Sequence, residues 1–155
     1  MNREHHYSVD VAWLGNRGTG TSGYREYGRQ GLVTAEGKHP IESSADRTFH
    51  GDRDRWNPEE LLLAALAECH MLSFLHVAVQ HGIVVTDYTD AATGTMVQEG
   101  DGGRFTSVTL HPAVTVAGEV TDEQLRAAHH EASEKCFIAN SMNFPVRHEP
   151  RAVRA

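Results

Sequence analysis

Apolar and polar positions alternate near the start of the chain. In residues 7–14 the apolar side chains fall at positions 7, 9, 11 and 13, the period of a β-strand with one buried face. Four glycines follow within residues 15–23 and favour a tight turn, with Arg17 at its tip. Residues 24–34 predict a further strand, and the polar segment 40–55 predicts a long loop.

The pattern then changes to that of a long apolar helix. Asn57 suits the N-cap, Pro58 the first helical position, and Glu60 completes a capping box. Residues 61–81 are apolar nearly all round, which indicates a helix buried on most faces, and Gly82 suits its end. The polar residues that interrupt the run are Glu68, His70, His76 and His81. We therefore expect a core helix and no membrane span.

Strand-like segments and a second helix follow. The segments are 83–88, 91–98, 105–110 and 113–117, with a turn at 101–103. Their order predicts a meander. Thr121 to Gln124 form another capping box, and apolar residues at helical spacing lead from Leu125 to Cys136. A last strand is expected near Phe144 to Val146. The chain is thus predicted to be one α/β (α+β) domain over residues 1–155, with one cysteine on each of two helices.

Composition narrows the class of protein. The 155 residues are 39% apolar and 23% charged, which is ordinary for a globular domain. A net charge of −7 with scattered Lys and Arg argues against nucleic acid as a partner. The first ten residues contain no apolar signal segment. We expect a soluble cytoplasmic protein that binds neither nucleic acid nor membrane.

The two cysteines, Cys69 and Cys136, have two interpretations. Two thiols do not make the disulfide framework of a small secreted domain, and disulfides of cytosolic proteins are usually transient and catalytic. Free cysteines are also common as inert buried residues. The cysteine count does not decide between these readings.

The spacing of these elements resembles that of a known family. Asn57-Pro58-Glu59-Glu60-Leu61 is followed by an Ala-rich stretch and Cys69, and a second helix ends at Cys136 with Asn140 four residues later. This arrangement, across nearly the whole chain, is similar to that of the OsmC/Ohr family. The resemblance implies antiparallel sheets wrapped around two central cysteine-bearing helices, an intertwined homodimer, and a stress-response enzyme that reduces organic hydroperoxides.

The resemblance also assigns roles to four residues. Cys69 corresponds to the peroxidatic cysteine, Cys136 to the resolving cysteine, Glu59 to the active-site carboxylate, and Arg17 to the active-site arginine. Arg25 or Arg29 takes the place of Arg17 if the alignment shifts. Proline commonly follows the second cysteine in the family, whereas Phe137 stands here. The resemblance is therefore to a divergent branch of the family.

The chemistry suits these residue types. A thiolate must attack the peroxide oxygen, and a free thiol with a pKa near 8.5 is mostly protonated at neutral pH. A guanidinium stabilises the thiolate and donates to the peroxide oxygens, while a carboxylate orients the guanidinium. The sulfenic acid then condenses with a second thiol. Without the resemblance, Arg17 reads as a solvated loop residue and Glu59 as a helix-dipole carboxylate.

A substrate pocket and a reductant are also expected. The alkyl chain of a hydroperoxide needs apolar side chains beside the thiol. The candidates, which read equally well as core residues, are Leu72, Phe74, Ile138, Met142 and Phe144. The expected reductant is a dithiol of the lipoyl type or a small thiol, and no cofactor is expected.

Two other functions remain open. One is a non-catalytic dimeric protein that binds a small hydrophobic ligand, and the other is a metal-binding module. The candidate metal ligands are His70 beside Cys69 and the His129-His130 pair, but no Cys-x-x-Cys or His-Glu-x-x-His spacing is present. We expect no metal site, and the role of His70 beside Cys69 is left open.

The helix also sets a limit on which chain supplies which residue. If the helix from Asn57 is unbroken, Glu59 and Cys69 are ten residues apart, which corresponds to about 15 Å along the axis. A glutamate side chain cannot reach the thiol over that distance. We therefore expect the carboxylate and its arginine to serve the cysteine of a partner subunit across a two-fold interface, with a break in the helix as the alternative.

Overall fold

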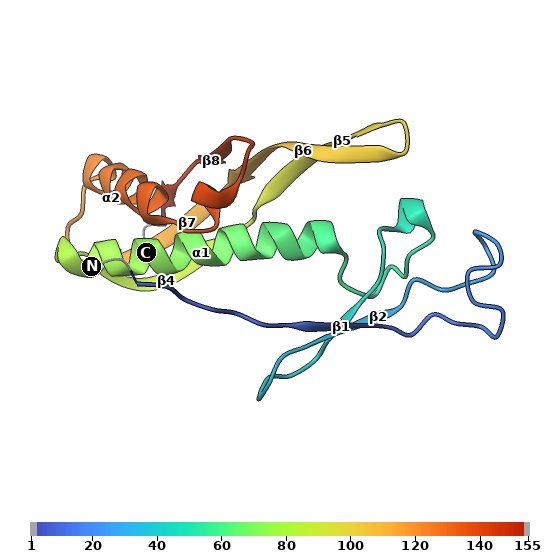
Figure 1. Ribbon diagram of the computed structural model, residues 1–155. Coiled ribbons are helices and arrows are strands. Elements are labelled where there is room, and N and C mark those ends of the chain that lie inside the picture. The colour runs from blue at the N-terminus through green and yellow to red at the C-terminus, as the bar shows by residue number, and fades with distance from the viewer. Residues whose placement is uncertain (1–2, 154–155) are drawn as a thin grey trace. The chain divides into compact units, whose positions relative to one another are not determined.

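The computed structural model describes residues 3–153, and the chain forms two compact units, residues 1–61 and 62–155. We call them the N-terminal unit and the C-terminal unit. Figure 1 labels their helices and strands. Two α-helices and several small sheets make up a mixed α+β architecture, as the sequence predicts.

The N-terminal unit contains a three-stranded antiparallel sheet in the order β1-β2-β3. The strands are β1 (Asp10–Trp13), β2 (Gly31–Thr34) and β3 (Ile41–Ser43), and a short 3-10 helix, η1 (Arg47–Phe49), follows. Both predicted strands are shorter than expected, and the predicted loop 40–55 contains β3 and η1. Residues 24–27 form turns because Arg29 donates to the carbonyls of Tyr24 and Tyr27, both at 2.6 Å.

Helix α1 (Pro58–Gln80) begins and ends where the sequence predicts. The Asn57 side chain accepts from the Glu60 N–H at 2.8 Å, and the Glu60 carboxylate accepts from the Asn57 N–H at 3.2 Å. At the other end Gly82 has a φ of 67°, and the Ile83 N–H donates to the Ala78 carbonyl at 2.9 Å. These bonds satisfy backbone groups that a helix end leaves free.

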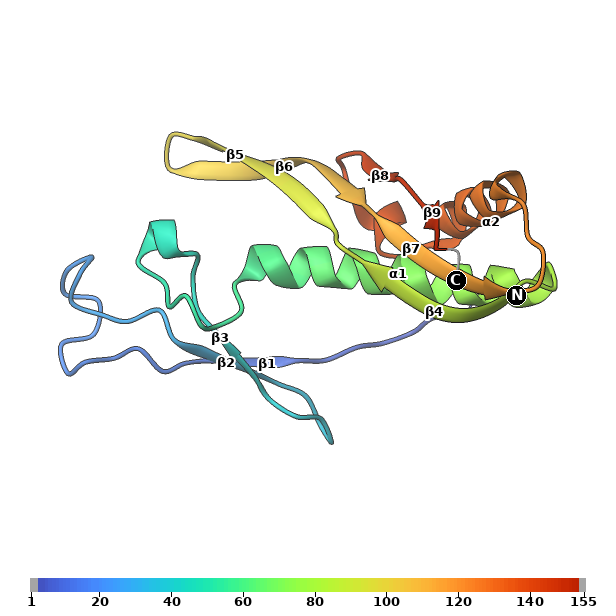
Figure 2. The same cartoon turned by 180° about the vertical axis from the view of Figure 1, so that it is seen from behind.

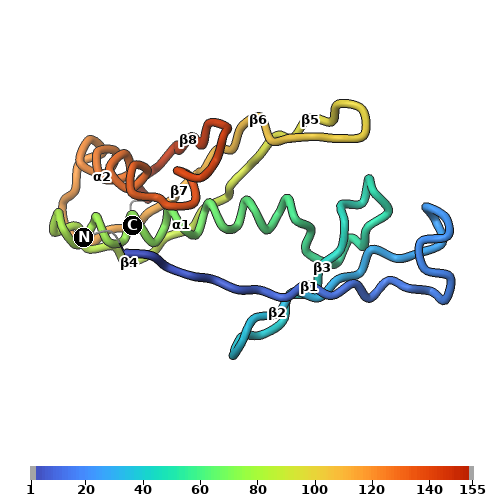
Figure 3. The backbone as a smooth tube through the Cα atoms, in the orientation of Figure 1, coloured from blue at the N-terminus to red at the C-terminus, as the bar shows by residue number. Residues whose placement is uncertain are grey.

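The strands of the C-terminal unit form a long bent hairpin and not the predicted meander. Its strands are β4 (Val84–Asp90), β5 (Thr93–Glu99), β6 (Gly102–Leu110) and β7 (Pro112–Ala117). β4 pairs with β7 and β5 with β6, both antiparallel, as Figures 2 and 3 show. The turn centres on Gly100, with a φ of 63°, so the predicted turn residues Gly102 and Gly103 lie in β6.

Two short strands close the sheets from the C-terminal end. β8 (Val146–His148) pairs with β6, and β9 (Arg151–Ala152) pairs with β7, and both pairings are parallel. The expected antiparallel pairings hold for β1 to β7, and the two short strands make both sheets of the C-terminal unit mixed. The predicted last strand lies at β8, so it begins at Val146 and not at Phe144.

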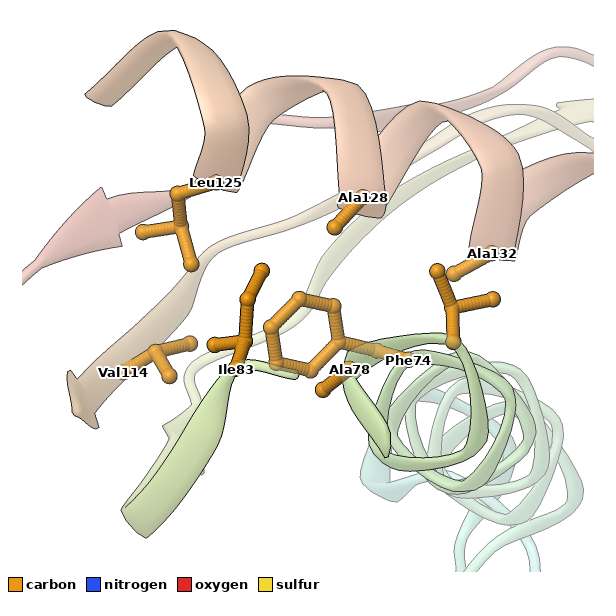
Figure 4. Packing of buried hydrophobic residues seen from close by; sticks show 8 residues of the cluster. Phe74, Ala78, Ile83, Val114, Leu125, Ala128 and Ala132 are labelled. Carbon is orange, nitrogen blue, oxygen red and sulfur yellow. The ribbon is translucent and has the colours of Figure 1, made fainter. Parts of the chain in front are cut away.

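Helix α2 (Asp122–Lys135) packs against α1 and the sheet around one main core. The Thr121 side chain accepts from the Gln124 N–H at 3.1 Å, and the Gln124 side chain accepts from the Thr121 N–H at 2.9 Å, which confirms the capping box. Figure 4 shows the ring of Phe74 beside Ile83, on the side of α2 from which Ala128 points toward it. The buried residues of this cluster are Phe74, Val77, Ala78, Ile83, Val114, Leu125, Ala128 and Ala132. A second cluster gathers around Leu66, Val108 and Leu110.

Within one chain, α1 buries only one stripe of its surface. The buried positions are Leu66, His70, Phe74, Val77 and Ala78. By length and composition α1 could cross a membrane, and only 28% of its most apolar window is buried. Leu72 is 57% exposed and Val79 is 78% exposed. The expectation of a helix buried on most faces is therefore not met by a single chain.

Candidate active site

Cys69 lies in the middle of α1, and its side chain is partly exposed. It directly precedes His70, which belongs to the buried stripe. Because consecutive helical residues point about 100° apart, Cys69 stands at the border between the buried stripe and the open face. The helix therefore gives this thiol access to solvent while keeping it beside the core.

Cys136 lies directly after α2 and forms its C-cap, with a φ of −74° and a ψ of 106°. The residue is fully buried. The chain then turns back, with the Asn140 N–H donating to the Cys136 carbonyl at 3.0 Å. The backbone N–H groups of Ile138 and Ala139 hydrogen-bond the Cys136 thiol. The end of α2 thus fixes this thiol inside the C-terminal unit.

The structure brings the two thiols together. The Cys69 side chain lies near enough to the Cys136 thiol to affect its pKa, although 67 positions separate the two cysteines in the sequence. Burial, together with the neighbouring Cys69 side chain, raises the pKa of the Cys136 thiol above its usual value, and the two backbone N–H groups offset this only in part. Both cysteines are free thiols. One thiol is thus accessible, and its neighbour is buried and protonated.

Arg17 and Glu59 are not paired within the N-terminal unit. The exposed Arg17 guanidinium donates to the Arg25 carbonyl at 3.4 Å. Glu59 Oε2 is buried and has no hydrogen-bond partner among the described residues. Arg29, the second alternative, is held between the rings of Tyr24 and Tyr27, with its Cζ 4.6 and 4.0 Å from their centroids. The Glu59 carboxylate is therefore left without the cation that the resemblance implies.

The five residues predicted to line an apolar pocket do not gather in one place. Leu72 is exposed, whereas Phe74 belongs to the main core. Ile138, Met142 and Phe144 are partly buried against the second cluster. A cavity of about 170 Å³ does adjoin Cys136, but polar and apolar residues share its lining. The residues that line it are His70, Leu110, Ser133, Cys136, Ala139, Asn140, Val146 and His148.

The sequence analysis missed a column of aromatic rings beside the thiols. His70 Nε2 and His129 Nδ1 share a hydrogen bond of 3.0 Å. The His129 ring stacks on Phe74 at 3.9 Å between centroids, and the His70 ring stacks on His148 at 5.5 Å. His70 and Phe74 are four residues apart on α1, and His129 precedes Cys136 by two helical turns. That spacing was the available signal for these histidines.

Burial keeps these histidines neutral. Burial lowers the pKa of His70 to about 4, and the nearby His148 adds to the effect. Burial, with smaller effects of His70 and His148, lowers the pKa of His129 to about 3. His129 Nε2 is buried without a partner among the described residues, as is the hydroxyl of Tyr88. The stacked histidine rings thus place polar but uncharged groups in the core at neutral pH.

The same residues do not form a metal centre. In residues 3–153 no group of three or more His, Cys, Asp or Glu side chains has a geometry that could hold a metal ion. The suggested ligands His70 and His129 bond to each other, and His130 lies 3.7 Å from Glu134 on the exposed side of α2. The described histidines therefore do not converge on a metal site.

Comparisons with known proteins agree with this fold. The family profile described as "OsmC-like protein" matches residues 50–151. An OsmC-like protein of unknown function from Vibrio cholerae is 32% identical with a TM-score of 0.87, and the match covers 96% of this chain and 100% of that one. No curated protein matches the chain.

More distant structures share the fold and carry functional names. An organic hydroperoxide resistance protein OsmC from Legionella pneumophila is 21% identical with a TM-score of 0.70, covering 97% of this chain and 100% of that one. An organic hydroperoxide resistance protein from Elizabethkingia anophelis is 20% identical with a TM-score of 0.70, covering 99% and 100%. At these identities the likeness concerns the fold.

Proposed function

Because this chain belongs to the OsmC-like protein family, we propose that it is a thiol-dependent peroxidase that reduces organic hydroperoxides to alcohols. The observation that carries the proposal is the contact between a partly exposed thiol, Cys69, and a buried thiol, Cys136. The names of the structural relatives from Legionella pneumophila and Elizabethkingia anophelis give the substrate class. A small-ligand-binding role does not need two neighbouring thiols, and among the described residues no third ligand joins them to make a metal site.

The difference in burial supports different roles for the two thiols in this proposal. The thiolate is the nucleophile, and burial raises the pKa of Cys136, so that thiol stays protonated at neutral pH. Solvent and substrate reach Cys69, because its side chain is partly exposed. Cys69 is therefore the peroxidatic cysteine and Cys136 the resolving one.

The reaction then balances with one hydroperoxide and two thiols. The Cys69 thiolate attacks the terminal oxygen, the O–O bond breaks, and the departing alkoxide takes up a proton to become an alcohol. Cys69 is left as a sulfenic acid. The Cys136 sulfur attacks it, its proton joins the departing hydroxide as water, and a Cys69–Cys136 disulfide forms. A dithiol of the lipoyl type or a small thiol returns both cysteines to the reduced state.

A homodimer completes the site in this proposal. α1 leaves apolar side chains such as Leu72 and Val79 exposed although its opposite stripe packs on α2. A second copy of the chain suits that face better than lipid does, because Glu68 and His76 lie on exposed positions of the same helix. The partner would cover the open face of α1.

The unbroken helix supports a site shared between subunits. α1 runs without interruption through Glu59 and Cys69, so their backbones are about 15 Å apart along the axis. The unpartnered Glu59 carboxylate is then free to orient Arg17 beside the partner's thiol, where the guanidinium stabilises the thiolate. Each monomer would supply an incomplete site.

The central test is the mass of the protein before and after one equivalent of cumene hydroperoxide. We expect the loss of two hydrogens and a Cys69–Cys136 linked peptide. With Cys136→Ser we expect one turnover and then sulfinic acid on Cys69. Full multi-turnover activity of Cys136→Ser with a dithiol would contradict the resolving role.

Subunit exchange tests the shared site. Inactive Cys69→Ser subunits are mixed with inactive Arg17→Ala subunits under conditions that exchange chains. The heterodimer then contains one complete site if Arg17 serves the partner's thiol, so activity should return. Absence of recovery despite proven exchange would place Arg17 and Cys69 in the same chain.

A further inference from the structure

The cavity beside Cys136 differs from what the hydroperoxide requires. It measures about 170 Å³ and is lined by Cys136 but not by Cys69. Two imidazoles, those of His70 and His148, form part of its wall, and among the described residues no carboxylate, lysine or arginine lines it. Leu110, Ala139 and Val146 supply the apolar part of the wall, so the cavity suits a small molecule that has both a polar end, which can exchange its hydrogen bonds with water for bonds to the protein, and a short apolar part.

The polar groups of the wall mostly accept hydrogen bonds. The Ser133 hydroxyl donates to the His130 carbonyl at 2.7 Å, so its oxygen is left as an acceptor. The Asn140 side-chain N–H donates to the Glu134 carbonyl at 2.9 Å, which leaves the amide oxygen free. Burial lowers the pKa of His148, so this imidazole is neutral and can take up a proton. A ligand that brings its own donors suits this cavity.

We propose that this cavity admits a small polar thiol to the Cys136 sulfur of the oxidised protein, so that reduction of the Cys69–Cys136 disulfide begins at Cys136. The inference rests on the proposed peroxidase cycle and names the sulfur at which the reductant enters. It separates two entrances: the hydroperoxide meets the partly exposed Cys69, and the reductant meets Cys136 from the other side.

The choice of sulfur also follows from the leaving group. In thiol–disulfide exchange the attacked sulfur keeps the incoming thiol, and the other sulfur departs faster when its thiol has the lower pKa. Attack on Cys69 would expel Cys136, whose burial raises its thiol pKa. Attack on Cys136 expels Cys69, which departs at a position that solvent reaches. Cys136 is fully buried, so the cavity at its side and the leaving ability of Cys69, not exposure, favour attack on the Cys136 sulfur.

Each step of this reduction balances. The incoming thiol gives its proton to the His148 imidazole, and its sulfur bonds to Cys136 as the disulfide breaks. Cys69 departs as a thiolate and recovers a proton from His148 through solvent. A second thiol molecule attacks the sulfur of the first, which releases a symmetrical disulfide and the Cys136 thiol. Two small thiols thus supply the two electrons.

The test begins with the disulfide form of the intact protein, made separately with cumene hydroperoxide and with diamide. It is treated briefly with limiting 2-mercaptoethanol, quenched with excess N-ethylmaleimide and mapped by mass spectrometry. We expect the mercaptoethanol adduct on Cys136 and maleimide on Cys69. The reverse assignment would overturn the proposal. If diamide but not the peroxide forms the disulfide, the peroxidase function fails while the point of entry is still measured; if neither does, both fail.

A rate measurement decides the matter if neither adduct survives the quench. Ala139→Val narrows the cavity, and we expect reduction by 2-mercaptoethanol to slow about tenfold. Ala127→Val, on an exposed position of α2 away from the cavity, is the matched control and should reduce at the wild-type rate. His148→Gln removes the proton acceptor without adding bulk and should also slow reduction. Wild-type rates in both cavity variants would overturn the proposal.

Discussion

The thiol pair, Cys69 and Cys136, and the histidine pair, His70 and His129, both connect α1 with α2, but the two pairs differ in their exposure to solvent. Cys69 and His70 are neighbours on α1, while His129 lies on α2 and Cys136 caps its end. The thiol pair has a partly exposed member and a cavity at its side. The histidine pair is at most 1% exposed and is stacked on Phe74.

The difference shows how burial separates two chemistries that share one framework. A thiol that must meet a hydroperoxide keeps one open edge. Imidazoles that would otherwise titrate near neutral pH are buried, and burial lowers their pKa so far that they stay uncharged. The histidine pair therefore supports the structure, and the thiol pair is the one to which we assign the proposed reaction. Substitutions in each should then affect different measurements.

The largest effect is expected from Cys69→Ser. Because the serine hydroxyl is a far weaker nucleophile at neutral pH, hydroperoxide consumption should fall by about a thousandfold or more. The urea midpoint should stay close to that of the reduced wild type. A coupled peroxide assay and an unfolding curve measure the two quantities. A rate within tenfold of wild type would mean that another group performs the attack.

Phe74→Ala tests the opposite side of the comparison. The ring is fully buried and stacks on His129, so its removal should cost about 3–5 kcal/mol in the free energy of unfolding. The matched control is Phe137→Ala, since Phe137 is 73% exposed and should change stability by no more than about 0.5 kcal/mol. Equal effects in urea titrations would contradict the buried stack.

The histidine pair predicts how stability depends on pH. Burial lowers the pKa of His70 to about 4 and that of His129 to about 3, so below pH 6.5 the unfolded chain binds more protons than the folded one. Stability is then lost as the pH falls, on the order of 4 kcal/mol between pH 7 and pH 5, with about half of it from each histidine. Urea titrations at both pH values measure it, with exposed His39→Asn as a control that should keep the slope. A flat profile would refute the sealed pair.

The smallest effect is expected from Thr121→Ala. Loss of the cap at the start of α2 should cost about 1 kcal/mol. Loss of the cap should lower stability but leave the rate of hydroperoxide consumption under folding conditions unchanged, because the cap lies at the opposite end of α2 from Cys136. Thr121→Ser keeps the hydroxyl and should restore most of the loss. A change in rate without a change in stability would show that the cap acts on the site itself.

The sequence predicted both helices because the residues that cap them lie close together in the chain. It did not predict which strands pair, because paired strands such as β4 and β7 are far apart in the chain. Asn57 and Thr121 bond within their own first turns, so the sequence identifies both helix starts. Alternation of apolar residues marks a strand but not its partner, and a predicted meander became a hairpin.

The candidate site divides in the same way. The family spacing points to Cys69 and Cys136, and the structure places their thiols in contact. The hydrogen bond between His70 and His129 joins residues 59 positions apart, so the spacing of residues within either helix does not predict which histidines pair. Arg17 stands on a glycine-rich loop whose backbone has few constraints, and the sequence does not fix where its side chain goes.

The distance along the chain between the two touching thiols has a mechanical consequence. A disulfide between Cys69 and Cys136 closes a loop of 136 − 69 = 67 residues, and cross-linking a loop of that length lowers the entropy of the unfolded chain enough to add about 4 kcal/mol of stability. Within each proposed catalytic cycle the C-terminal unit would therefore alternate between a less stable reduced form and a more stable oxidised form. Its melting temperature would then report the redox state of the cell around it.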